Sequence, residues 1–138
     1  MPKNYVLDAC ALLAFIKEET GYEIVRGLLM DAAANKISVY MNKLNLFEVF
    51  YGIRREQGLA KAEHVYNILM RLPVVIIDGI ADEVFLEASR IKSSYHMSLA
   101  DSIALGEASV MDASLVTSDH HEFDVVDKNE VIQFTWLR

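Results

Sequence analysis

The sequence predicts an α/β fold in which a parallel sheet lies between layers of helices. Short apolar runs rich in Val, Ile and Leu alternate along the 138 residues with longer segments of helical periodicity. Strands separated by helices pair in parallel, because each crossover brings the chain back in the same direction. The length and the ordinary composition predict a single domain, residues 1–138, large enough for a hydrophobic core.

Local signals set the bounds of the predicted elements. Thr20 and Glu23 have the spacing of a capping box, which predicts that a helix begins there. Gly58 separates two helical segments, and Pro73 precedes a continuous apolar run, Val74–Ile77, of the fully buried kind. The expected order is strand 5–7, helix 9–17, helix 20–35, strand 37–41, helix 44–56, helix 59–71, strand 74–77, helix 80–93, helix 98–111, strand 114–117 and strand 131–134.

Charge and cysteine content narrow the class of protein. The net charge of −7 argues against a nucleic-acid binder that relies on a large positive field. The single cysteine, Cys10, cannot form an intramolecular disulfide, which fits a reducing compartment. Asp8 interrupts the first apolar stretch, so no signal peptide is expected, and the apolar run 9–16 is too short to span a bilayer. We therefore expect a cytoplasmic protein without a membrane segment.

Four acids stand at structurally informative positions. Asp8 and Asp119 each follow an apolar strand, whereas Glu48 and Asp101 lie within apolar helix faces. Such acids are expensive to bury without a partner, and four of them in one pocket would repel one another unless cations held them together. The sequence therefore predicts a divalent-metal site, and phosphoryl transfer is the chemistry that such sites commonly perform.

Each acid also has a purely structural interpretation. Taken singly, these interpretations are the more common ones, because Asp and Ser are frequent N-caps and a buried Glu often pairs with Arg. In the structural interpretations, Asp8 is the N-cap of the helix that follows it, and Ser98 with Asp101 forms a capping box. Asp119 is the N-cap of a short helix through Glu122, and Glu48 pairs with Arg26 or Arg90.

Four segments that contain the four acids match one family in order and spacing. The segments are Tyr5-Val6-Leu7-Asp8-Ala9-Cys10-Ala11-Leu12-Leu13, Asn45-Leu46-Phe47-Glu48-Val49-Phe50-Tyr51-Gly52, Met97-Ser98-Leu99-Ala100-Asp101-Ser102-Ile103-Ala104-Leu105 and Leu115-Val116-Thr117-Ser118-Asp119-His120-His121-Glu122-Phe123. With these segments the chain resembles PIN-domain ribonucleases, in particular the VapC-type toxins of prokaryotic toxin–antitoxin pairs. The resemblance implies a single PIN-like domain, a three-layer sandwich with a central parallel five-stranded sheet.

The same resemblance implies an activity and partners. Asp8, Glu48, Asp101 and Asp119 would be the catalytic quartet that binds Mg²⁺ or Mn²⁺ and hydrolyses RNA phosphodiester bonds. A hydroxyl of Thr117 or Ser118 would assist, and Asp124 would be a fifth, peripheral acid. Homodimers and a cognate antitoxin protein are further features of the family. An RNA-processing nuclease outside a toxin–antitoxin pair, or a PIN-fold module that binds RNA or protein without cutting, remain alternatives.

Further residues are candidates for contact with RNA. The basic ones surround the helix that carries Glu48, and the aromatic ones could stack on bases. The candidates are Lys43, Arg54, Arg55, Lys61, Tyr51 and Tyr95. Among them, Tyr51 is expected to pack in the core. Three other residues are not candidates: His120 and His121 are expected at the surface, and Cys10 is expected to be a small buried residue.

Overall fold

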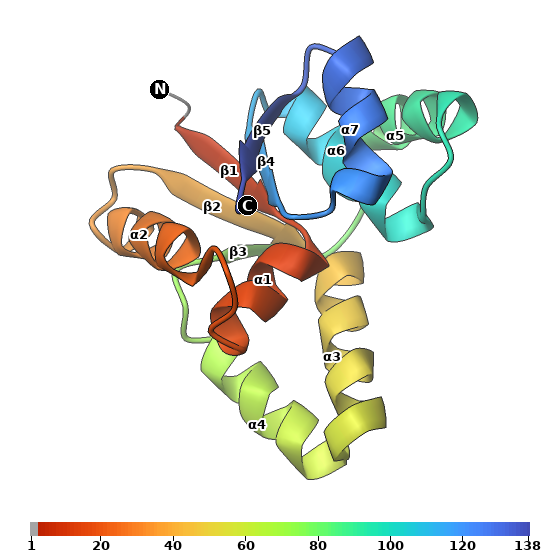
Figure 1. The fold of residues 1–138 in the computed structure, drawn as a ribbon. Helices are drawn as coiled ribbons and strands as arrows, with labels where there is room; N and C mark the ends of the chain where they lie inside the picture. The colour runs from red at the N-terminus through yellow and green to blue at the C-terminus, as the bar shows by residue number, and fades with distance from the viewer. Residues whose placement is uncertain (1–2) are drawn as a thin grey trace.

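A five-stranded parallel sheet forms the centre of the molecule, and helices cover both of its faces (Figure 1). The computed structural model describes residues 3–138. The spatial order of the strands is β3-β2-β1-β4-β5, and every neighbouring pair is parallel. This arrangement confirms the predicted fold class. The strands are β1 (Asn4–Leu7), β2 (Ser38–Asn42), β3 (Val75–Ile77), β4 (Ser114–Thr117) and β5 (Gln133–Trp136).

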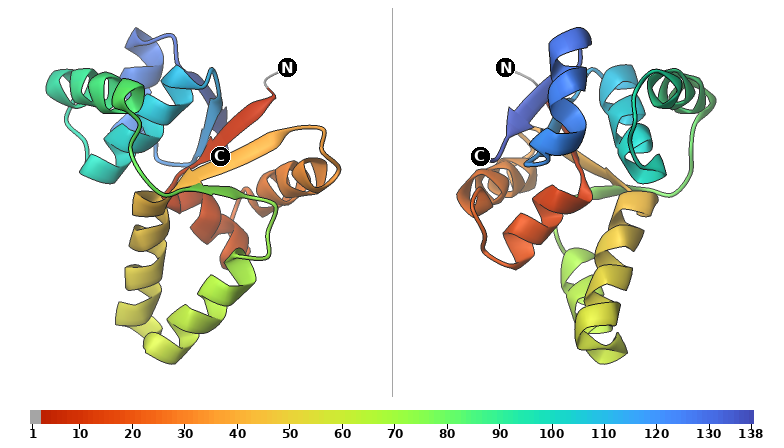
Figure 2. Two further views of the ribbon diagram at one scale, coloured as in Figure 1. Left: turned by 180° about the vertical axis from the view of Figure 1, so that it is seen from behind. Right: turned by 45° about the vertical axis from the view of Figure 1, so that its right-hand side comes forward.

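Seven helices connect the strands of the described chain. Helices α1 and α2 lie on one side of the sheet, and α5, α6 and α7 lie on the other (Figures 1 and 2). Helices α3 and α4 form a hairpin that extends away from the sheet (Figure 2). The bounds are α1 (Ala9–Ile16), α2 (Tyr22–Ala33), α3 (Lys43–Gln57), α4 (Leu59–Leu69), α5 (Asp82–Ser94), α6 (Leu99–Val110) and α7 (His120–Asn129).

The alternation of side chains along β1 divides the core into two halves. Tyr5 and Leu7 belong to the cluster that packs with α1 to α4, and Val6 belongs to the cluster under α5 to α7. All three are buried, because β1 is the central strand and both of its faces are covered. The central position of β1 is what carries its last residues, and the acid that follows them, into the interior.

The structure corrects four sequence-based expectations. The capping box is wrong, because the N-cap of α2 is Gly21 and no side chain caps this helix. Gly21 has φ of 96°, and a Cβ there would lie 2.5 Å from Cβ of Leu137, so the packing of the C-terminal segment determines where α2 begins. Strand β3 is an edge strand with Val75 half exposed, not a fully buried one. The helix after Asp119 runs ten residues rather than ending at Glu122, and β5 begins two residues later than expected.

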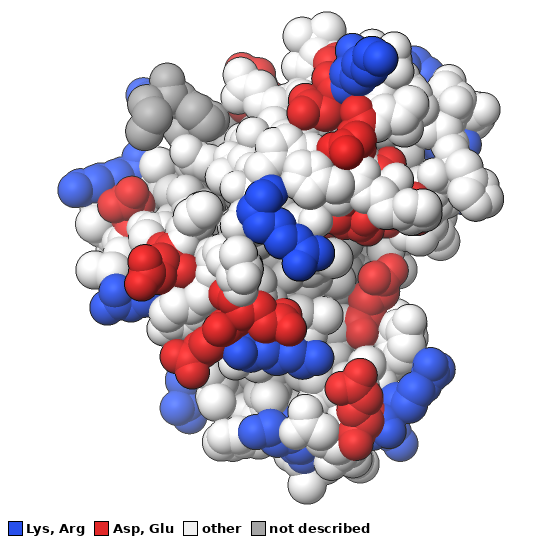
Figure 3. Space-filling model, in the orientation of Figure 1, with Lys and Arg blue, Asp and Glu red and all other residues white. Residues whose placement is uncertain are grey.

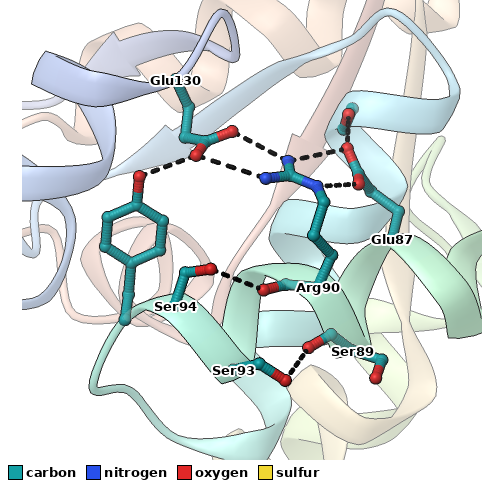
Figure 4. Close-up of polar contacts among 8 residues, drawn as sticks. Glu87, Ser89, Arg90, Ser93, Ser94 and Glu130 are labelled. Carbon is teal, nitrogen blue, oxygen red and sulfur yellow. Dashed lines mark hydrogen bonds and ion pairs between the residues drawn. The ribbon is translucent and has the colours of Figure 1, made fainter.

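An ion-pair network ties α5 to the end of α7. Nε of Arg90 lies 2.7 Å from Oε1 of Glu87, and Nη2 of Arg90 lies 2.8 Å from Oε1 of Glu130 (Figure 4). The hydroxyl of Tyr95 donates to Glu130 at 2.7 Å. Because Arg90 is engaged by these two acids, the interpretation that pairs it with Glu48 is wrong. Tyr95 likewise serves the network, which leaves it less available as a platform for RNA bases.

Candidate functional site: an acidic group at the switch point of the sheet

The site lies where the strand order reverses. The chain builds β1, β2 and β3 outward in one direction and then returns to place β4 on the other side of β1. Ligands of open α/β sheets bind in the crevice at the carboxyl ends of the strands at such a point. Asp8 directly follows β1, and Thr117 ends the neighbouring β4, with Leu7 paired to Val116 in the register. The register therefore brings these two residues side by side.

Asp8 is held by two hydrogen bonds. Its side chain is 1% exposed, and its Oδ1 accepts from the backbone N–H of Ala11 at 2.8 Å, so Asp8 is the N-cap of α1. The hydroxyl of Thr117 donates to Oδ2 of Asp8 and accepts from the backbone N–H of Asp119 at 3.0 Å. Thr117 thus connects two of the four acids, and it is the hydroxyl in contact with the site. The capping interpretation of Asp8 is confirmed, and it also fixes the carboxylate in the crevice.

Asp119 and Asp101 are placed by helix starts. Asp119 is the N-cap of α7, and its Oδ1 accepts from the N–H of Glu122 at 3.1 Å. Ser98 is the N-cap of α6 and accepts from the N–H of Asp101 at 3.1 Å, so the predicted cap at Ser98 is confirmed. Both acids are partly buried. Helix starts direct backbone N–H groups toward the acids, and this field favours negative charge there.

Glu48 comes from α3, and a buried amide stands one turn before it. Asn45 is fully buried, its Nδ2 donates to the carbonyl of Ala100 at 3.4 Å, and within residues 3–138 its Oδ1 has no partner. The contact with Ala100 sets α3 beside the residue that precedes Asp101. Glu48 itself is partly buried and makes no ion pair in the described part of the chain, so neither arginine interpretation holds.

Electrostatics show that the four acids share one region. The pKa of Asp8 is raised to about 7, mainly by burial and to a smaller extent by the charges of Asp101 and Asp119, against the hydrogen bonds from Thr117 and Ala11. The pKa of Asp101 is raised to about 6, mainly by burial and to a smaller extent by the charges of Glu48 and Asp119, against the hydrogen bond with Ser98. The pKa of Glu48 is raised by burial. These mutual effects require proximity, so α1, α3, α6 and α7 bring the predicted quartet to one region of the molecule.

The residues of the site fit a hard divalent cation in their chemistry. In the part of the chain that the structure describes, no three His, Cys, Asp or Glu side chains are arranged as ready-made ligands. Like charges repel one another when nothing compensates them, and three of these acids are only partly buried. Carboxylate, hydroxyl and amide oxygens are the ligands that Mg²⁺ and Mn²⁺ prefer. The orphaned Oδ1 of Asn45 adds another such oxygen nearby.

Several residues near the site differ from their sequence-based roles. Tyr51 is 39% exposed rather than packed in the core, and Phe47, which the sequence reasoning overlooked, is 60% exposed. The signal for both was available in their spacing of four, which puts them on one side of α3 next to Glu48. Asp124 pairs with His120 at 2.7 Å rather than joining the other acids. Cys10 is half-buried, and burial together with the neighbouring acids raises its pKa to about 12, which makes it a poor nucleophile.

A cleft beside the acids contains a positive charge that sequence reasoning also missed. It has a volume of about 620 Å³, and its lining includes Cys10, Ser118 and Arg138 together with the acids Glu18 and Glu19. Cys10 follows Asp8 by two residues and Ser118 precedes Asp119, so the cleft adjoins the quartet. Arg138 is far from the acids in sequence, and only the pairing of β5 with β4 brings it there.

Comparison with known proteins agrees with this geometry. The model of the PIN domain family matches residues 5–129, which include all four acids. The chain belongs to the PIN-domain family. An alpha-1,4 glucan phosphorylase L-1 isozyme from Solanum tuberosum is 31% identical over 81 residues, 58% of this chain, but the chain spans only 8% of that protein, so its activity is not transferred here.

Solved structures of VapC toxins have the same fold. A DNA-bound VapBC from Salmonella typhimurium matches with a TM-score of 0.73 and 17% identity, covering 100% of both chains. VapBC2 from Rickettsia felis, bound to a DNA fragment from the promoter of the pair, gives 0.72 and 15%, covering 96% of this chain and 97% of that one. The sarcin-ricin loop cleaving toxin VapC20 from Mycobacterium tuberculosis gives a TM-score of 0.65 and 14% identity, covering 92% of this chain and 96% of that one.

No helix in the described chain is long and apolar enough to cross a bilayer.

Proposed function

We propose that this protein is a metal-dependent ribonuclease and the toxin of a toxin–antitoxin pair. The observation that supports the activity is the proximity of four acids, with raised pKa values at Asp8, Asp101 and Glu48, near the switch point of the sheet. Such an array is unfavourable without cations, and it belongs to a PIN domain. The antitoxin partner is supported by the VapBC complexes that share the fold. A ribonuclease and a toxin with a protein antitoxin would both act in the cytoplasm, which is the location we propose.

The residues of the chain have distinct roles in this proposal. Asp8, Glu48, Asp101 and Asp119 hold Mg²⁺ or Mn²⁺. When bound, the ion lowers the pKa of a water and compensates charge at the phosphate. The hydroxyl of Thr117 orients Asp8, since it donates to the oxygen that the N–H of Ala11 does not occupy.

Aromatic and basic groups near the acids would bind the RNA. The rings of Phe47 and Tyr51 lie 5.3 Å apart, and the guanidinium of Arg55 lies 5.4 Å from the centre of the Tyr51 ring. These three groups follow one line along α3 at intervals of four residues and begin beside Glu48. Exposed rings and guanidinium planes are surfaces on which unpaired bases stack. Lys and Arg side chains also occur over the lower part of the molecule, where α3 meets α4 (Figure 3). On the other side of the acids, Arg138 offers a phosphate contact in the cleft.

Cleavage of RNA in the presence of Mg²⁺ and then EDTA tests the activity. Water attack predicts products with 5′-phosphate and 3′-hydroxyl ends, because the neighbouring 2′-hydroxyl takes no part. Asp101→Asn should abolish cleavage, and Asp31→Asn, which alters an exposed acid of α2, should not. Cleavage that persists in EDTA, or products that end in a 2′,3′-cyclic phosphate, would contradict the proposal. Co-expression with the neighbouring small reading frame, followed by purification of a complex, tests the antitoxin.

A further inference from the structure

Two polar contacts join the helices that carry Glu48 and Asp101. Asn42 is the N-cap of α3, where its Oδ1 accepts from the N–H of Leu44 at 2.9 Å. Its Nδ2 donates to Oε2 of Glu107 on α6 at 3.0 Å. The second contact is that of Asn45 with the carbonyl of Ala100. Because α3 carries Glu48 and α6 carries Asp101, these contacts set the distance between two acids of the site.

Glu107 is an unusual residue for its position. It is 1% exposed, its Oε1 has no partner within the described residues, and its pKa is raised to about 6 by burial. A buried carboxyl with an orphaned oxygen destabilises a fold, and an apolar residue of similar size would be tolerated better. The contact that Glu107 makes is with the amide of Asn42, which also reaches the carbonyl of Gly79 at 3.1 Å. The amide of Asn42 thus joins the loop after β3, α6 and the start of α3.

We propose that Asn42 and Glu107 form a clamp that positions Glu48 relative to Asp101 for metal binding. This inference rests on the proposed function. Glu48 on α3 and Asp101 on α6 carry like charges on the two helices that these contacts join, so they repel each other before an ion is bound. The far part of α3 extends away from the sheet with α4 (Figure 2), whereas the polar contacts of α3 with α6 are made near its start, by Asn42 and Asn45. With the clamp in place, the acids are held near each other in advance, and less of the binding energy of the ion is spent on moving α3. Asn42 and Glu107 are positioning residues that act through Glu48.

Two substitutions that exchange the donor and the acceptor test the contact between Asn42 and Glu107 separately from the role of Asn42 as the N-cap of α3. Asn42→Asp retains an oxygen that caps α3 but replaces the donor with a second carboxylate that faces Glu107. Glu107→Gln retains an oxygen that accepts from Asn42. In the double variant, the amide introduced at position 107 can donate to the carboxylate introduced at position 42, so the contact is restored with donor and acceptor exchanged. The double variant also has the same net charge as the wild type. The measurement is the Kd for Mg²⁺ of each folded protein, by calorimetry at about pH 8, with the unfolding temperature recorded in parallel.

The clamp predicts a distinct pattern of Kd values. Asn42→Asp should weaken Mg²⁺ binding about tenfold or more, as loss of a residue that orients metal ligands usually does. Glu107→Gln should bind within about twofold of the wild type. The double variant should recover the part of the loss that comes from the contact with position 107, but not the part that comes from the bond to Gly79. A mere charge effect predicts the opposite sign for Asn42→Asp, since an added negative charge near the site strengthens cation binding. Tighter or unchanged binding by Asn42→Asp would therefore overturn the clamp.

A matched control distinguishes a positioning role from simple stabilisation. Ser114→Ala removes the buried hydroxyl contact between Ser114 and Thr135, 2.7 Å long, at the opposite end of β4. It should lower the unfolding temperature and leave the Kd for Mg²⁺ unchanged. If Ser114→Ala and Asn42→Asp weaken Mg²⁺ binding equally, the clamp is overturned, because general destabilisation then explains both. If the wild type itself binds no Mg²⁺ or Mn²⁺, the proposed function fails and the clamp fails with it.

Discussion

Replacement of Asp8 by Asn is expected to stabilise the protein while it abolishes activity. Asp8 is buried beside other acids, and its pKa is raised from 3.8 to about 7, so its ionised form is disfavoured in the folded state. An Asn at this position can still accept from the N–H of Ala11 as the N-cap of α1, and its amide can donate to the hydroxyl of Thr117. The substitution therefore removes the charge and retains most of the local contacts.

The size of the stabilisation by Asp8→Asn and its pH dependence follow from the raised pKa of Asp8. A rise from 3.8 to about 7 corresponds to about 4 kcal/mol, at about 1.4 kcal/mol per pH unit. Above about pH 4 the unfolded chain loses this proton while the folded protein keeps it until about pH 7. The unfolded state then binds fewer protons, so the wild-type free energy of unfolding falls as the pH rises through this window. This loss is large against a typical total of about 5–15 kcal/mol.

Urea denaturation in EDTA, at about pH 8 and about pH 4, measures the effect. Asp8→Asn should exceed the wild type by roughly 2–4 kcal/mol at the higher pH. The difference should fall below about 1 kcal/mol at the lower pH, where Asp8 is protonated in the folded state and partly protonated in the unfolded chain. Added Mg²⁺ should stabilise the wild type at about pH 8 and the variant much less. A variant that is less stable than the wild type at about pH 8 would refute the reasoning that burial of this carboxylate opposes folding.

Three further predictions concern residues around the quartet. Thr117→Val removes the hydroxyl whose hydrogen bond lowers the pKa of Asp8. The pH midpoint of Mg²⁺ binding, measured by titration, should therefore move upward. An unchanged midpoint would contradict that contact. Phe47→Ala should weaken the binding of single-stranded RNA about fivefold or more in a filter assay in Ca²⁺, since stacking supplies about 1–3 kcal/mol per base, and equal affinity would remove Phe47 from the substrate surface. Cys10 should react with iodoacetamide at about pH 8 at least about a hundredfold more slowly than in the unfolded chain, because its pKa is raised to about 12, and comparable rates would show an accessible, ordinary thiol.

The amino-acid sequence alone was sufficient for the order of all elements except α7, which the expected order left out, and for the choice of four acids as candidate site residues. Period and run length are local properties, so Tyr5–Leu7 and Ser114–Thr117 were predicted as strands close to their observed bounds. The start of α2 was mispredicted, because Gly21 is selected by its contact with Leu137 at the other end of the chain. Val75 was expected to be buried, because an apolar run has the same composition in a central strand as in an edge strand.

Only the tertiary structure decided which groups surround the acids. Sequence can place Asp8 after a strand, but the pairing of β1 with β4 is what gives it the hydroxyl of Thr117 as a donor. The contact of Asn42 with Glu107 joins residues 65 positions apart, and no local pattern indicates that two buried polar side chains will meet. The physical reason is that burial and long-range hydrogen bonds depend on how the layers pack, whereas the propensity to form a strand or helix is set by near neighbours along the chain.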